Sequence, residues 1–266
     1  MMSIKGKIAI VFLFLLIVSA SFVSFLPLDP NNFDPHALGE PLAPSLQHLF
    51  GTDDLGRDVL LRSIYGARIS LLVGFVSVGF ALTIGIIIGV CSGFIGGVVD
   101  EIIMRLVDLI MALPTIFLIL IIQSMTKPNI MNVIIVIGCT SWMGVARLVR
   151  AEVLSIKNRG FVIALRARSL KESKILIKHI LPHALTPIIV AGVLGIGGAI
   201  LTESTLSFLG LGVQPPFASW GNMLENSMNF MFDAPWLAIA PGLLITGTVL
   251  SLNFLGDDLR GKFNPK

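Results

Sequence analysis

The chain has 266 residues, of which 55% are hydrophobic and only 13% are charged. Soluble globular domains carry about 25% charged residues, so the composition excludes an ordinary soluble domain. The formal net charge is +3. In so apolar a chain, basic residues are interpreted by their position relative to a membrane, and we expect no nucleic-acid partner.

Six uncharged runs are each long enough to cross a bilayer, which takes a helix of about 18 or more apolar residues. They cover residues 8–28, 69–99, 109–126, 128–146, 180–202 and 234–256. The sequence therefore predicts an all-α polytopic membrane protein with six transmembrane helices. Residues 1–28 would hold the N-terminus and first span, 29–68 an outer loop with an amphipathic helix, 69–256 a five-helix core and 257–266 a tail.

The first run also has features of a secretory signal peptide. Lys5 and Lys7 precede it, and Val18, Ser19 and Ala20 resemble a cleavage site. The apolar part of a cleaved signal covers about 7–15 residues, whereas this run continues through Leu26. We therefore expect a helix that is retained.

The second half of the outer loop reads GTDDLGRDVLLRSIYGARIS, residues 51–70. Asp53 or Asp54 could cap a helix there. Apolar residues then recur at helical spacing, at Leu55, Val59, Leu60 and Ile64. The pattern predicts an amphipathic helix along the outer membrane surface, and a solvated loop with chance periodicity is the alternative.

Glycines recur every four residues near the end of the second span, at Gly85, Gly89 and Gly93. Stripes of small residues let helices approach closely in lipid, so we favour a packing role over a pore-lining role. A tight turn over residues 96–105 should follow, and Pro114 should kink the third span.

The Lys and Arg residues are unevenly divided between the two sides that six spans create. If the N-terminus is cytoplasmic, all of them except Arg57, Arg62, Arg68 and Lys127 lie on the cytoplasmic side. Basic residues favour that side of a membrane. The sequence thus predicts that both termini are cytoplasmic, together with the basic segment 151–182 between spans four and five.

The second outer loop, residues 203–236, contains neither Lys nor Arg. Trp220 and Trp236 are expected at the level of the lipid headgroups, where tryptophan is enriched. Cys91 and Cys139 lie in apolar runs without C-x-x-C spacing, so we expect two buried, unpaired side chains.

No catalytic motif is present. The sequence lacks a GxxxxGK[ST] phosphate loop, a GxGxxG fingerprint, HExxH and GxSxG, so we expect no enzyme activity and no catalytic, cofactor or metal site. His179 and His183 could share a helix face, but Pro182 lies between them and no other ligand is near. A capping or interfacial role is therefore favoured over metal binding.

Charge is also absent from the middle of each span, while Asp108, Arg147 and Glu203 lie near span ends. A secondary transporter normally binds its coupling ion near the bilayer midplane. The pattern argues against a stand-alone secondary transporter or channel, which stays the alternative because backbone carbonyls can also bind Na⁺.

Three segments carry a resemblance to a known family. They read GTDDLGRDVLLRSIYGARISL (51–71), SFLGLGVQPPFASWGNML (207–224) and PWLAIAPGLLITGTVLSLNFLGDDLRGKFNP (235–265). The chain resembles the permease subunits of ABC importers for dipeptides, oligopeptides and nickel, specifically the second of two paired permeases. The resemblance implies a type I ABC importer permease fold in a bacterial or archaeal plasma (inner) membrane.

The resemblance also implies a set of partners. They are a second homologous permease that completes a heterodimer, two ATPase subunits that bind ATP and Mg²⁺, an extracytoplasmic solute-binding protein and membrane lipid. In this family the permease docks on the ATPase through two short helices whose loop follows the pattern E-A-A, then G, then H-x-L-P.

The docking residues implied by that pattern are Ala164, Arg166, Ala167, Ser169, His179, Leu181 and Pro182. Three positions depart from the family pattern: Ile163 replaces Glu, Leu165 replaces the second Ala, and Ser169 replaces Gly. Because glycine adopts a positive φ without strain, serine at this turn should either change its geometry or accept strain. No residue is identified as a substrate ligand, and the divergent docking loop and short N-terminus are more similar to nickel-type than to peptide-type members.

Overall fold

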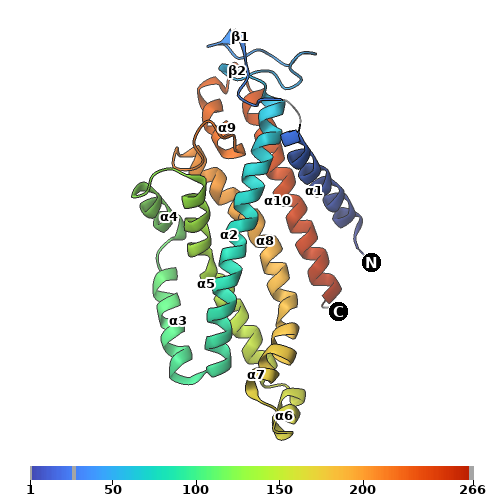
Figure 1. The fold of residues 1–266 in the computed structure, drawn as a ribbon, viewed down its shortest axis with the longest axis vertical. Coiled ribbons are helices and arrows are strands. Elements are labelled where there is room, and N and C mark those ends of the chain that lie inside the picture. Colours follow the sequence, from blue (N-terminus) through green and yellow to red (C-terminus); the bar gives the residue numbers. More distant parts are fainter. Residues whose placement is uncertain (1, 26–27, 264–266) are drawn as a thin grey trace.

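The computed structural model describes residues 2–25 and 28–263. Long helices lie side by side in an elongated bundle, with a small sheet at one end and two short helices at the other (Figure 1). The N-terminal part comprises α1 (Ile4–Phe22), the 3-10 turn η1 (Val23–Phe25), β1 (Phe33–Leu38), β2 (Leu55–Arg57), α2 (Val59–Ile95), α3 (Gly97–Met111) and α4 (Thr115–Ser124). The remainder comprises α5 (Ile130–Lys157), α6 (Gly160–Ala167), α7 (Glu172–Ile175), the π turn η2 (Leu176–Ile180), α8 (Leu181–Phe208), α9 (Trp220–Ser227), η3 (Met228–Phe230) and α10 (Trp236–Phe263).

Five helices in the described residues are long and apolar enough to cross a membrane: α1, α2, α5, α8 together with the helical turns before it, and α10. The bent pair α3 and α4 would make a sixth crossing. The predicted all-α class is confirmed, with the two-stranded antiparallel sheet of β1 and β2 as an addition. Residues 257–263 of the predicted tail continue α10, whereas Met1, residues 26–27 and residues 264–266 lie outside the described residues.

The prediction of a separate surface helix over residues 51–70 is wrong. Residues 55–57 form β2, and α2 then runs without interruption from Val59 to Ile95. Its N-cap is Asp58, whose carboxylate accepts a hydrogen bond from the backbone N–H of Leu61, rather than Asp53 or Asp54. The first turns of α2 therefore extend the second span beyond the uncharged run.

The connection between spans two and three is shorter than predicted. Only Gly96 separates α2 from α3, and Gly96 and Gly97 have φ values of 73° and 59°, a conformation that glycine adopts without a side-chain clash. The predicted kink at Pro114 is a complete break, because α3 ends at Met111 and α4 leaves it at 76°. Proline has no N–H to continue the helical ladder and restricts the residue before it.

The glycine stripe of α2 packs against α5, as predicted. A Cβ atom at Gly85 would lie 2.6 Å from the side chain of Val145, and one at Gly89 would lie 2.5 Å from the carbonyl oxygen of Ala146. Backbones can approach this closely only where the side chain is absent. The resulting interface between α2 and α5 is the most extensive helix contact in the bundle.

The charges at the ends of α3 and α5 are paired across that side of the bundle. Arg147 forms an ion pair with Asp108, and Arg150 forms one with Asp100. Both acidic residues come from α3 and both basic residues from α5, so the pairs fix the register of the two helices at their shared end.

Trp220 is fully buried, so its ring does not contact lipid, and its level in the membrane stays a prediction. Its indole N–H donates to the carbonyl oxygen of Ser63 (3.0 Å), which satisfies the polar atom that would otherwise keep the ring near water. Trp236 is half-buried at the start of α10. Cys91 and Cys139 are exposed on the chain surface, contrary to prediction, because a run of apolar residues shows that a residue is in a span but not which face it occupies.

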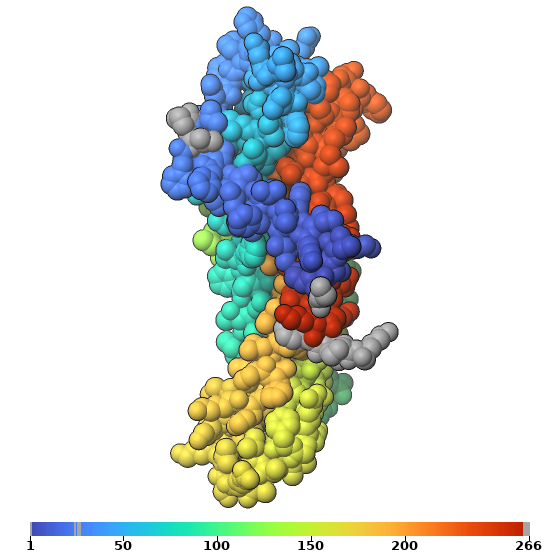
Figure 2. Space-filling model, turned by 90° about the vertical axis from the view of Figure 1, so that its right-hand side faces the viewer, coloured from blue at the N-terminus to red at the C-terminus, as the bar shows by residue number. Residues whose placement is uncertain are grey.

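Both ends of the described chain lie on one side of the bundle, toward α6 and α7 and away from β1, β2 and α9 (Figure 1). The backbone N–H of Ser3 donates to a carboxylate oxygen of Asp258 (3.0 Å), which joins the starting end of α1 to the final part of α10. Figure 2 shows α1 lying across α10 and the α6–α8 region projecting below them. The shared side of the termini agrees with an even number of crossings, and its cytoplasmic location stays a prediction.

Candidate functional site

The segment with the predicted docking residues forms the extreme end of the molecule (Figure 1). We call residues 160–180 the end segment; it contains α6, a four-residue turn, α7 and η2. Three of its apolar side chains, Val162, Ile175 and Ile180, are fully buried. They pack in one cluster with Val149, Val153 and Ile156 of α5. The apolar spacing thus attaches two short helices, too short to be stable alone, to the end of a long one.

The turn of the end segment keeps a glycine-like backbone. Ser169 has a φ of 59°, and in the described residues it is the one position other than glycine with a positive φ. Its N–H donates to the carbonyl oxygen of Arg166 (2.8 Å), which closes the end of α6. Of the two outcomes expected for serine here, the structure has the strained one, which costs about 1–2 kcal/mol relative to the right-handed region.

An ion pair joins the two short helices across this turn. Nε of Arg166 donates to Oε1 of Glu172 (2.8 Å), and Nη2 donates to Oε2 (3.1 Å). The hydrogen bond to Glu172 raises the pKa of Arg166 above its usual value, so the guanidinium stays charged. The two parallel contacts set the angle between α6 and α7.

The predicted docking residues occupy two parts of this end. Ala164 and Ala167 are exposed on α6 beside the half-buried Arg166, and Ser169 is exposed in the turn. The others lie at the junction of the π turn and α8, where His179 and Leu181 are half-buried and Pro182 is exposed.

The contact between those two parts comes from residues that the sequence did not single out for docking. The rings of Phe161 on α6 and His183 on α8 lie 5.3 Å apart, and Nδ1 of His183 donates to the carbonyl oxygen of His179 (2.6 Å). Ile163, identified in the sequence only as a departure from a pattern, has 57% of its surface exposed. The outward face of α6 is thus apolar, with Ile163 and Phe161 beside the two small alanines.

Substitution of Ser169 should show that the turn requires a left-handed residue. Ser169→Gly should keep or slightly raise stability, because glycine removes a penalty of about 1–2 kcal/mol while adding about 0.5–1 kcal/mol of chain entropy cost. Ser169→Val should increase amide hydrogen exchange in residues 160–180, because a β-branched residue disfavours this region further. Equal exchange in the glycine and valine variants would contradict the assignment.

A second polar arrangement lies at the opposite end of the molecule. The carboxylate of Asp53 pairs with Arg57 (2.7 Å) and Arg62 (3.7 Å), and all three side chains are buried. Oδ1 of Asp53 also accepts hydrogen bonds from the backbone N–H groups of Leu55 and Arg57. This arrangement holds β2 on the start of α2.

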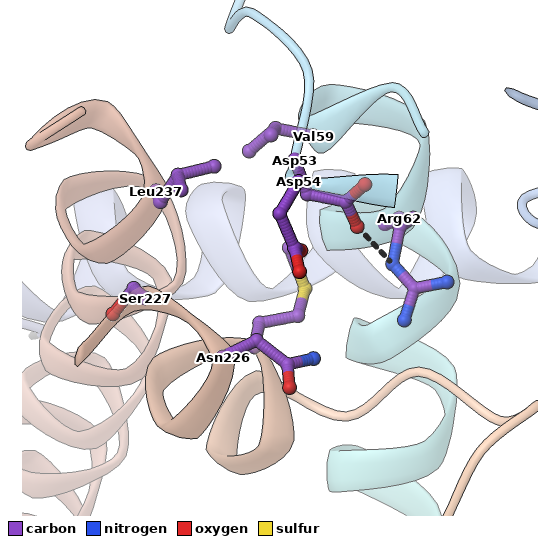
Figure 3. Close-up of a pocket in the computed structure, with 8 residues that line it drawn as sticks. Asp53, Asp54, Val59, Arg62, Asn226, Ser227 and Leu237 are labelled. Carbon is purple, nitrogen blue, oxygen red and sulfur yellow. Dashed lines mark ion pairs between the residues drawn. The ribbon is translucent and has the colours of Figure 1, made fainter. Parts of the chain in front are cut away.

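A small cavity beside Asp53 is shown in Figure 3, where the Asp53–Arg62 ion pair is dashed. It measures about 10 Å³ and is lined by Asp53, Asp54, Val59, Arg62, Met223, Asn226, Ser227 and Leu237. That is about the space of one water molecule. The arrangement is therefore a structural junction between the outer loop, α2, α9 and α10 rather than a substrate pocket.

His179 and His183 are in direct contact at the junction of η2 and α8. Within residues 2–25 and 28–263, no group of three or more His, Cys, Asp or Glu side chains is placed to hold a metal ion. The hydrogen bond from His183 to the carbonyl oxygen of His179 is a local capping interaction.

Comparison with known proteins places this arrangement in a family. Residues 81–266 match the family described as "Binding-protein-dependent transport system inner membrane component". The chain is 40% identical to the dipeptide transport system permease protein DppC of Alkalihalophilus pseudofirmus, over 98% of this chain and 87% of the relative. It is 38% identical to the oligopeptide transport system permease protein OppC of Bacillus subtilis, over 100% of this chain and 86% of the relative.

The fold has a solved counterpart. A chain of the MetNI methionine ABC transporter in an inward-facing conformation matches with a TM-score of 0.65 and 19% identity, over 77% of this chain and 97% of that chain. This likeness supports the type I permease architecture of the bundle. Taken with the family match over most of the chain, it shows that the protein belongs to the binding-protein-dependent inner membrane components and is a multi-pass permease subunit of a bacterial ABC importer.

Proposed function

We propose that this chain carries di- or oligopeptides, delivered by an extracytoplasmic binding protein, through the membrane as one of two paired permeases. Two separate ATPase subunits would supply the energy. The observation that carries the proposal is the high identity over nearly the full length of relatives named as dipeptide and oligopeptide permeases. The prediction of nickel as substrate has no such support, and we favour peptides.

The end segment is the part of the chain that we assign to ATPase docking. It projects from one end of the bundle, it is held rigidly on α5 by buried apolar residues, and its exposed face carries small and apolar side chains. Such a face fits a groove on another protein, because small residues permit close approach. This assignment places the end segment and both termini in the cytoplasm, which is the side that the basic residues favour.

Vesicle transport tests the proposed function. The chain is reconstituted with its partner permease, ATPases and binding protein, which we expect to be encoded beside it, and uptake of a labelled dipeptide, oligopeptide and nickel chelate is measured. We expect peptide uptake that requires ATP and stops when the ATPases are inactivated. Uptake without ATP that follows an ion gradient would favour the secondary-transporter alternative, and uptake of the nickel chelate alone would overturn the substrate.

A charge on the exposed face of α6 should separate ATP hydrolysis from transport. Ala164→Asp should lower peptide uptake by at least about tenfold, because an unpaired carboxylate in a protein interface costs more than about 1.4 kcal/mol. The variant should keep the unfolding temperature of the wild type, since Ala164 is exposed.

Gly261→Asp is the matched control for this variant. Gly261 is exposed near the end of α10, and a Cβ atom there meets nothing within 4 Å. The Gly261→Asp variant introduces the same charge as Ala164→Asp, on the same side of the bundle but outside the end segment. Normal uptake and substrate-stimulated hydrolysis in Ala164→Asp would show that Ala164 is not at the interface.

A further inference from the structure

A large hollow lies between α5, α8 and α10, on the side of the bundle that carries the end segment. It measures about 830 Å³, within the range of small-molecule sites. One face of α5 lines it through Leu148, Glu152 and Ser155, which follow helical spacing, and Arg159 lines it from the connection between α5 and α6. Six residues of α8, from His183 to Leu194, and Arg260 of α10 complete the lining.

The three charged side chains that line this hollow, Glu152, Arg159 and Arg260, form no ion pairs with one another. Among residues 2–25 and 28–263, neither Glu152, Arg159 nor Arg260 takes part in an ion pair or a side-chain hydrogen bond. They contrast with Arg147 and Arg150 on α5, which are both paired with acidic residues of α3. Glu152 and Arg260 lie on spanning helices, near the ends on the side of the end segment, and Arg159 lies just beyond the end of α5. The hollow therefore presents charges of both signs that can pair with a ligand.

The arrangement of charge and apolar surface selects one class of ligand. A peptide with free ends carries a carboxylate, which suits Arg159 and Arg260, and an ammonium group, which suits Glu152. Leu148, Val190 and Leu194 provide apolar surface for its side chains. An anionic phosphate headgroup would use the arginines but be repelled by the carboxylate of Glu152.

The charges of opposite sign occupy separate positions in the hollow. Glu152 lies on α5, whereas Arg159 follows the end of α5 and Arg260 lies on α10. We infer that this hollow binds the two free ends of a short peptide during passage, with Glu152 at the amino end and Arg159 and Arg260 at the carboxyl end. This inference rests on the proposed function of the chain.

Protection of an engineered cysteine tests the site directly. In a Cys91→Ser, Cys139→Ser background, Ser155→Cys places a thiol in the wall of the hollow. Glu101→Cys places one at the exposed start of α3, outside both the hollow and the end segment. The complete transporter in vesicles with its ATPase side outward is treated with a charged maleimide, without ATP, in the presence of trialanine. Saturating trialanine should slow labelling of Ser155→Cys by about tenfold, because occupancy excludes the reagent by mass action, and leave labelling of Glu101→Cys unchanged.

Blocked peptides and charge variants assign the two ends. N-acetylation of the peptide or Glu152→Gln should each reduce protection, and the two together should add little to either alone. C-terminal amidation should behave in the same way with Arg159→Gln or Arg260→Gln. Lys262→Gln, on the same helix as Arg260 but outside the lining, should leave protection unchanged.

Three outcomes would overturn the site. Equal labelling rates with and without trialanine would show that the peptide does not bind there, as would protection insensitive to all three charge variants. Protection that depends on phosphatidylethanolamine or an anionic lipid instead of the peptide would assign the hollow to a headgroup. ATP-dependent uptake by the unmodified transporter is measured on the same vesicles, so failure of the site is distinguished from failure of the proposed function.

Discussion

Glu203→Leu should release α9 and the loop before it from the bundle. Glu203 is fully buried in α8, and its carboxylate accepts hydrogen bonds from the hydroxyls of Ser207 (2.7 Å) and Ser70 (3.2 Å). Those hydroxyls in turn accept the backbone N–H groups of Val213 (3.0 Å) and Trp220 (3.2 Å). Two chains of hydrogen bonds, which we call the two arms, therefore join the side chain of Glu203 to the loop 209–219 and to the first residue of α9.

Leucine removes the acceptor at the centre of both arms. A buried polar group that is left without a partner costs about 1–3 kcal/mol, and polar pairs between membrane helices average about 0.6 kcal/mol. Because two serine hydroxyls lose their acceptor, we expect the free energy of unfolding to fall by about 1–4 kcal/mol. Proteolysis in residues 209–219 and thermal unfolding in detergent measure it, and peptide uptake should fall in parallel.

Two further substitutions separate the hydrogen bonds of Glu203 from its charge and volume. Glu203→Gln keeps an acceptor for one serine and supplies a donor to the other, so it should retain most of the stability. Thr205→Val is the control, because Thr205 is exposed and its hydroxyl bonds only to the carbonyl of Leu201 on its own helix. Wild-type protease resistance in Glu203→Leu would contradict the role assigned to this residue.

The sequence predicted which residues cross the membrane better than it predicted how they face. Uncharged runs are a local property, so five spans and a bent sixth follow from composition. The start of α2 was missed because two charged residues, Arg62 and Arg68, lie inside the helix. The guanidinium of Arg62 is accommodated by Asp53 and by the amide oxygen of Asn31 (3.0 Å), partners that come from the preceding loop.

The candidate site shows the same limit. The two short helices and the turn were predictable, because a basic segment interrupts an apolar chain and family resemblance locates its pattern. The strained φ of Ser169 and the pairing of Arg166 with Glu172 depend on how α6 and α7 meet, which spacing does not determine. Glu203 was placed near a span end by its position alone, and only the surrounding serines from α2 and α8 reveal its role.

Gly89→Ala and Gly79→Ala should change stability in opposite directions, although both replace a glycine in the middle of α2. Alanine is favoured over glycine in a helix by about 1 kcal/mol. A Cβ atom at Gly79 meets nothing within 4 Å, so this variant should be neutral or slightly more stable. At Gly89 the same atom would lie 2.5 Å from the carbonyl oxygen of Ala146, and overpacking of this kind costs about 1–3 kcal/mol or more.

The nature of the nearest atom at Gly89 sharpens the test. Because that atom belongs to the backbone of α5, the clash is relieved only by separating α2 from α5. Val149→Ala removes the Cγ1 atom that lies 3.0 Å from the added atom but leaves the backbone clash in place, and it should therefore not rescue Gly89→Ala. Unfolding in detergent measures the stability of the wild type, of Gly79→Ala, of Gly89→Ala, and of Gly89→Ala combined with Val149→Ala. Peptide uptake should fall only in the proteins in which Gly89 is replaced. Rescue by Val149→Ala would show that a side chain, rather than the approach of two backbones, sets the requirement for glycine in this stripe.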